Sequence, residues 1–144
     1  MTITGAIAAA PMLAGLAVGA ASTAWADPPT MNGHYVRTVT NAVGQATTAD
    51  WYFTPCGDGC ASAALTASGQ AFAQARLVNG QWTMDTMSPA ACADGSSVPD
   101  ALSAHYTWDP NTLAGTGQMT IKVPSCGRPV GYQQTNSVQL RQAP

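Results

Sequence analysis

Residues 51–60, Trp-Tyr-Phe-Thr-Pro-Cys-Gly-Asp-Gly-Cys, constrain the fold more than any other segment. Aromatic residues and threonine favour a β-strand, and Pro55 ends it because proline cannot donate to a β-ladder. Gly57 and Gly59 then favour a tight turn that brings Cys56 close to Cys60. The segment therefore predicts a short strand that ends in a turn closed by a disulfide.

Similar short segments of alternating polar and apolar residues, separated by turn residues, fill the rest of the chain. The sharpest turn signal is Asn79-Gly80, the dipeptide preferred in two-residue hairpins. Glutamate is absent, and the alternation favours strands over helices. We expect an all-β fold: a single antiparallel meander of seven or eight short strands, arranged as a small barrel or sandwich. The expected strands are 33–40, 48–54, 61–67, 71–78, 81–87, 103–108, 113–123 and 132–141.

The four cysteines could pair in three ways as disulfides. The presence of four cysteines in so short a chain favours an oxidising compartment. We expect Cys56–Cys60 and Cys92–Cys126, because the turn already brings the first pair close. Loop-closure entropy gives the short loop roughly 2 kcal/mol and the long loop roughly 4 kcal/mol of stabilisation. A redox Cys-x-x-Cys motif is absent, and no second close pair completes a zinc site, so we expect no metal.

Residues 1–26 are predicted to be a signal peptide, and residues 27–144 the secreted β domain. An apolar run ends in Ala24-Trp25-Ala26, the small-x-small pattern of a cleavage site. A membrane anchor is the alternative, but Pro11 interrupts the run, which is shorter than the ~20 residues of a span. We therefore expect no stable membrane span after cleavage.

The distribution of charged residues along the chain does not indicate a function. Five basic and seven acidic residues are scattered without the basic stripe that nucleic acid requires. No nucleophile, phosphate-loop or calcium-loop motif is present, so we expect neither a catalytic residue nor a cofactor. Asp50 and Asp85 are the aspartates within strand patterns, and a hydrolase would need them paired. His34 and His105 are interpreted as polar-face residues. The alternative is that either is a base or a haem ligand, and His105 beside Tyr106 and Trp108 would suit a haem-lined cavity.

Several aromatic residues lie at alternating strand positions. Trp51, Phe53, Trp82 and Tyr106 are the candidate ligand-binding residues, since they could line an apolar cavity. The competing interpretation is that they fill the core, because an eight-stranded barrel has an interior just wide enough for side chains or one small ligand.

A set of motifs across residues 51–129 gives the chain a family resemblance. These are Trp-x-Phe-Thr-Pro-Cys-Gly-x-x-Cys at 51–60, Asn-Gly-x-Trp at 79–82, Trp-Asp-Pro at 108–110 and Cys-Gly-x-Pro at 126–129. The chain resembles a group of small secreted mycobacterial proteins, with related segments in some kinase ectodomains. The resemblance implies export and disulfides, and it implies no activity. It does not imply a kinase, because no kinase motif is present.

A second resemblance is to lipocalin-type barrels. Gly33-His34-Tyr35 is similar to the Gly-x-Trp of those barrels, and Arg141 could stack over Tyr35.

From these observations we expect a monomeric, exported domain of the cell envelope or extracellular space that acts as a binding or interaction module, sensor-like and without catalysis. Its partner would be a protein or a small apolar ligand. The alternative is a lipocalin-like carrier of a small apolar ligand, and a hydrolase using Asp50 and Asp85 is more distant.

Overall fold

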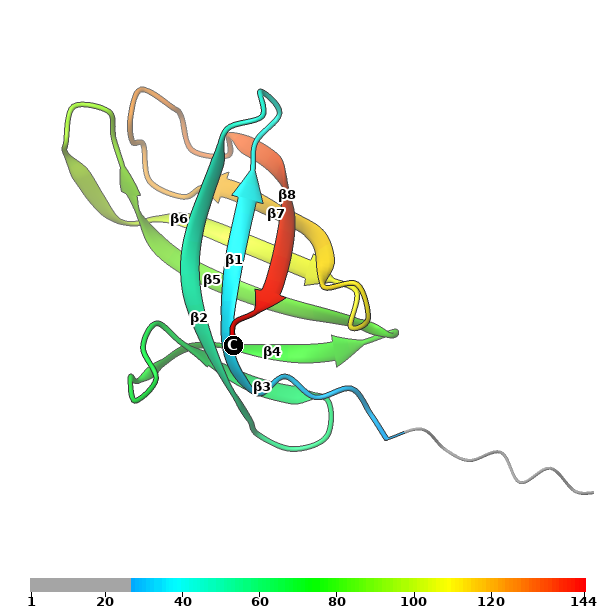
Figure 1. Ribbon diagram of the computed structural model, residues 1–144. Helices are drawn as coiled ribbons and strands as arrows, with labels where there is room; N and C mark the ends of the chain where they lie inside the picture. The colour runs from blue at the N-terminus through cyan, green and yellow to red at the C-terminus, as the bar shows by residue number, and fades with distance from the viewer. Residues whose placement is uncertain (1–26) are drawn as a thin grey trace, which may run out of the picture.

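The computed structural model describes residues 27–144, so the predicted signal peptide at 1–26 lies outside the described residues. The described chain is a closed antiparallel barrel of eight strands in sequence order (Figure 1). Neighbours in sequence pair throughout, and β1 closes the barrel by pairing with β8. The strands are β1 Gly33–Thr40, β2 Ala46–Pro55, β3 Cys60–Ala64, β4 Ala71–Val78, β5 Gln81–Ala91, β6 Ser97–Trp108, β7 Ala114–Ile121 and β8 Gln133–Gln142.

The all-β prediction is confirmed, and the barrel is the arrangement adopted. β1 and β4 begin and end at the predicted residues. The Asn79-Gly80 hairpin joins β4 to β5, and both residues have the positive φ that its turn type requires, 50° and 78°. None of the described residues forms a helix that could cross a membrane.

The β5–β6 hairpin is longer than the sequence pattern indicates. We expected residues 88–102 to be a loop, but β5 continues to Ala91 and β6 starts at Ser97. Pro89 lies where the β5–β6 register shifts, and Pro99 precedes the part of β6 that pairs with β7. Prolines are tolerated at such positions because no ladder hydrogen bond is lost.

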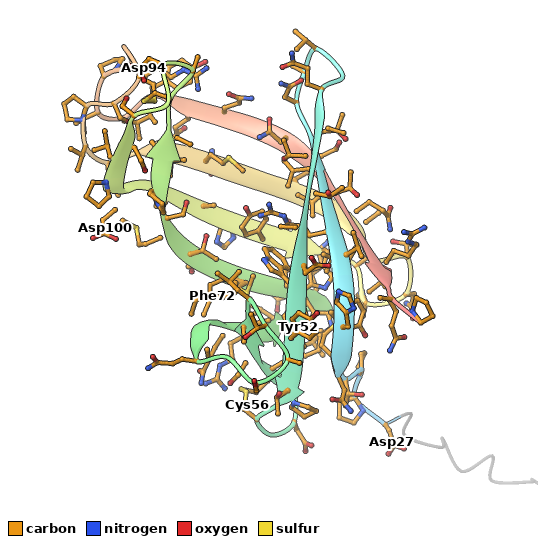
Figure 2. The ribbon with its side chains drawn as sticks, turned by 60° about the vertical axis from the view of Figure 1, so that its left-hand side comes forward. Asp27, Tyr52, Cys56, Phe72, Asp94 and Asp100 are labelled. Atoms are coloured by element: carbon orange, nitrogen blue, oxygen red, sulfur yellow. A yellow bond between two sulfur atoms is a disulfide. The ribbon has the colours of Figure 1, made fainter. Side chains whose placement is uncertain are left out.

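Both predicted disulfides are present, with Cα–Cα distances of 5.0 Å for Cys56–Cys60 and 5.2 Å for Cys92–Cys126. Cys56–Cys60 closes the turn between β2 and β3 (Figure 2). Cys92–Cys126 joins the β5–β6 turn to the loop that follows β7. We call these two linked loops, 92–96 and 122–132, the flap. Two disulfides are compatible with an oxidising environment.

One half of the barrel interior is filled by large side chains, and we call it the packed half. Phe53, Trp82 and Trp108 are at most 2% exposed, and the Trp82 and Trp108 rings stack at 6.5 Å. Gly117 allows this packing, because a Cβ there would lie 2.8 Å from the Tyr106 ring. Residues 113–121 alternate in burial, and Gly117 and Ile121 are buried, so their row faces the interior.

Towards the flap several inward side chains are smaller and less buried, and we call this the open half. Along β2, buried Trp51 is followed on the same face by exposed Thr47. Along β5, buried Met84 is followed by partly exposed Thr86 and Ser88. Inward positions on β2 and β5 are therefore less buried at this end of the barrel.

Short strands account for the open half. β3 pairs with β2 only along Tyr52–Pro55, and β4 pairs with β5 only along Gln81–Met84. Beyond these pairs, residues 46–51 of β2 and 85–91 of β5 have no strand between them. Figure 2 looks onto this side, with Asp94 on the flap and Cys56 at the opposite end.

Candidate functional site

A large hollow lies between the flap and the barrel wall. Its volume is about 1000 Å³, and we call it the flap hollow. Most of its lining is apolar. The lining residues are Ala90, Ala91, Cys92, Ala93, Asp94, Ser96, Val98, Leu102, Ile121, Pro124, Ser125, Cys126, Gly127, Arg128 and Pro129.

The barrel wall and the flap each supply one side of the hollow. Leu102 on β6 and Ile121 on β7 lie in the inward rows, so the hollow adjoins the open half of the interior. The opposite side is the turn 125–128, closed by Arg128 N donating to Ser125 O at 2.9 Å. Cys126 and Gly127 have the positive φ of a tight turn, and the disulfide holds Cys126 to Cys92.

A few polar groups surround this apolar lining. Ser96 donates hydrogen bonds to Asp94 from its hydroxyl and its backbone N–H, and these hold the pKa of Asp94 below its ordinary value. The guanidinium of Arg128 lies 5.0 Å from the Tyr132 ring. Ser125 Oγ is buried and has no hydrogen-bond partner among the described residues, so no base activates it as a nucleophile. Such a site can bind an apolar group.

The predicted ligand-binding residues lie elsewhere, in the core. Trp51, Phe53, Trp82 and Tyr106 are each at most 3% exposed. They pack on one another, with Trp51 5.2 Å from Tyr106 and 6.1 Å from Phe53, ring centre to ring centre. The flap hollow includes none of them. Their placement matches the competing interpretation, in which aromatic side chains fill a small barrel.

Asp50 and Asp85 each contact a histidine on the neighbouring strand. Asp50 Oδ1 lies 2.7 Å from His34 Nε2, and Asp85 Oδ1 lies 2.7 Å from His105 Nδ1. Both pairs lie on the outer surface, and β2 and β5 are not neighbours in the barrel. The structure thus forms two separate histidine–aspartate pairs where a hydrolase would need one carboxylate pair.

A smaller hollow of about 350 Å³ lies beside the second of these pairs. His105, Asp85 and Met87 contribute to its lining, and Phe72 stands at one side. In residues 27–144 no three His, Cys, Asp or Glu side chains gather as metal ligands would. Arg141 is exposed beside Val36, on the face opposite to Tyr35, so it does not stack over that ring.

The sequence did not single out Arg37. It lies on the same face of β1 as Tyr35 and Val39, but neither face of that segment is cleanly apolar, so the pattern could not show which face is inward. The structure turns all three side chains into the barrel.

Comparison of the chain with protein-family models, curated proteins and solved structures finds no significant match.

Proposed function

We propose that this chain is an exported, non-catalytic binding domain that holds an apolar group of a protein partner in the flap hollow. The observation that carries the proposal is the hollow itself: about 1000 Å³, lined mainly by apolar side chains and roofed by a disulfide-linked flap. Export to the cell envelope or extracellular space is part of the proposal, supported by the two disulfides.

The size and lining of the hollow support binding. Ligand sites are typically concave, about 300–1000 Å³, and mostly apolar with a few polar groups. Leu102, Val98 and Pro124 offer surface that gains roughly 25 cal/mol per Å² when a ligand removes it from water. Because the disulfide fixes both sides of the flap, less conformational entropy is lost on binding.

The arrangement of polar groups supports the absence of catalysis. The described His–Asp pairs lie on the outer surface, and Ser125 has no base beside it. Nucleophilic catalysis needs the nucleophile and base within hydrogen-bond reach.

A lipocalin-like carrier remains the alternative function. The hollow is large enough for one free small apolar molecule, and its position at the open half resembles a barrel mouth. The two functions differ in what occupies the hollow.

Native mass spectrometry of the protein purified from its host's culture fluid separates them. A partner polypeptide in the complex supports the proposal, whereas a small mass that leaves on denaturation supports the carrier. The variant Ala93→Trp fills the hollow from an exposed position and should abolish either complex. Ala67→Trp, on the exposed β3–β4 loop, is the matched control and should bind normally. Unchanged binding by Ala93→Trp would overturn the flap hollow as the site.

A further inference from the structure

Arg37 points into the barrel, at the boundary between the packed and open halves. Its neighbours on the same face of β1, Tyr35 and Val39, are each 5% exposed. In the adjacent strands it lies opposite Ala49 and Leu140. Ala49 is small, so β2 presents no large side chain directly opposite Arg37.

Aromatic rings position the guanidinium. Its central carbon lies 4.9 Å from the centre of the Trp51 ring and 5.7 Å from that of Tyr106, both within the range of a cation–π interaction. Nη1 donates a hydrogen bond to Tyr106 Oη at 2.9 Å, which links β1 to β6 across the interior. These contacts fix the plane of the group.

The other edge of the guanidinium has no partner among the described residues. Nε is buried and makes no hydrogen bond. Nη2 makes no hydrogen bond within residues 27–144 either. Nε and Nη2 together form the edge that binds a carboxylate through two parallel hydrogen bonds.

The positive charge of Arg37 is also unpaired. Guanidinium does not lose its proton in proteins, so the charge is permanent. The ion pairs found in residues 27–144 both join histidine to aspartate. All seven acidic residues of the chain are aspartates within that part, and none contacts Arg37. A partly buried charge without a counter-ion costs free energy. The hydrogen bond to Tyr106 accounts for Nη1, but a purely structural role for Arg37 leaves the donors Nε and Nη2 unexplained.

We propose that Arg37 binds the carboxylate of a small organic acid that enters through the open half of the barrel. The two carboxylate oxygens accept hydrogen bonds from Nη2 and, after a small shift of the side chain, from Nε. The apolar body of the acid packs against Phe72, which is 38% exposed beside the opening and whose ring centre lies 6.2 Å from that of buried Trp51 (Figure 2). This site is separate from the flap hollow, whose lining does not include Arg37.

The test is a titration of the folded protein with sodium benzoate, followed by ¹H–¹⁵N NMR. The Arg37 Nε–H and Trp51 indole N–H signals should shift together and saturate with a dissociation constant of about 1–10 mM, as a single-carboxylate fragment allows. Sodium chloride at matched ionic strength should leave them unchanged. No saturable shift up to 50 mM (about five times that upper limit), or an equal shift with chloride, overturns the proposal.

Variants locate the effect. Arg37→Met should weaken benzoate binding at least about tenfold, since it removes both donors and the charge. Arg76→Met removes an exposed arginine on the outer face of β4 and should bind as the native chain does. Benzoate binding that survives Arg37→Met overturns the proposal. If that variant does not fold, the signals that shift in the native protein still decide, because they must centre on Arg37.

The flap variant keeps the two proposals distinguishable. Ala93→Trp should leave the benzoate titration unchanged even though it abolishes binding in the flap hollow. Loss of benzoate binding in Ala93→Trp would place the acid under the flap and overturn the Arg37 site.

Discussion

The packed and open halves of the barrel share most of their strands but differ in the side chains that those strands direct inward. In the packed half, Trp82 and Trp108 exclude water almost completely. In the open half, the same β5 presents Thr86 and Ser88, which are too small to meet across the interior. The difference shows that strand pairing alone does not make a core; side-chain volume and the length of the neighbouring strands decide where water remains.

This division separates stability from binding. Large apolar side chains supply most of the favourable free energy of folding, and they concentrate in the packed half. The open half contributes little to the core, so its residues are free to contact a ligand. Substitutions at Trp108 and Gly117 test that separation.

Replacing a packed-half tryptophan should have the largest effect. Trp108 is 1% exposed and contacts the Trp51, Phe53 and Trp82 rings. Trp108→Ala should lower the free energy of unfolding by about 3–5 kcal/mol, because it leaves a cavity. Urea unfolding measures the change. Thr47→Ala, at an inward but exposed position, is the control, and its free energy of unfolding should stay within about 0.5 kcal/mol of the native value. Equal losses of stability in the two variants would contradict the distinction between the halves.

Gly117→Ala should be intermediate, because it acts at the boundary of the halves. The new Cβ would lie 2.8 Å from the Tyr106 ring, which must shift. We expect a loss of about 1–3 kcal/mol, as for other overpacked cores, and a weaker cation–π contact between Arg37 and Tyr106. Thermal unfolding and tyrosine fluorescence report the two effects. The neighbouring outward substitution Gln118→Ala should change neither, and an equal effect there would contradict the packing argument.

The smallest effect is expected at Asp109, in the turn that follows Trp108. The backbone N–H groups of Thr112 and Asn111 donate to its carboxylate and lower its pKa from the ordinary 3.8. A lowered native pKa adds stability above about pH 4 that is lost as pH falls through the native value. Asp109→Asn should therefore flatten the decline in stability between about pH 4 and pH 2. Urea midpoints across this range measure it, and unchanged slopes would show that the turn does not depend on charge.

Much of the fold could be predicted from local sequence. Asn79-Gly80 sets a hairpin through its own backbone preference, and the spacing of Cys56 and Cys60 makes their pairing local. The alternation of residues 113–123 identified the inward face of β7. Each of these signals depends on residues close together in the chain.

The candidate site could not be predicted in the same way. The flap brings Cys92 and Cys126 together from distant segments, and the prolines at 89 and 99 concealed the strands that carry it. The contacts of Arg37 depend on Tyr106, 69 residues away, and on the closure of the barrel that turns β1 inward. The aromatic residues chosen from the sequence were identified as interior, but the pattern cannot show whether an interior is filled or hollow.

The pairing of β1 with β8 also fixes where the chain enters and leaves the barrel. Ala143 N donates to His34 O at 2.9 Å, so the first and last strands meet at the packed end, away from the flap (Figure 1). A reporter or surface tether fused after Pro144 would therefore hold the domain with the flap directed outward. The same proximity makes a circular permutant feasible, with a short linker joining the two ends and new termini opened in an exposed turn.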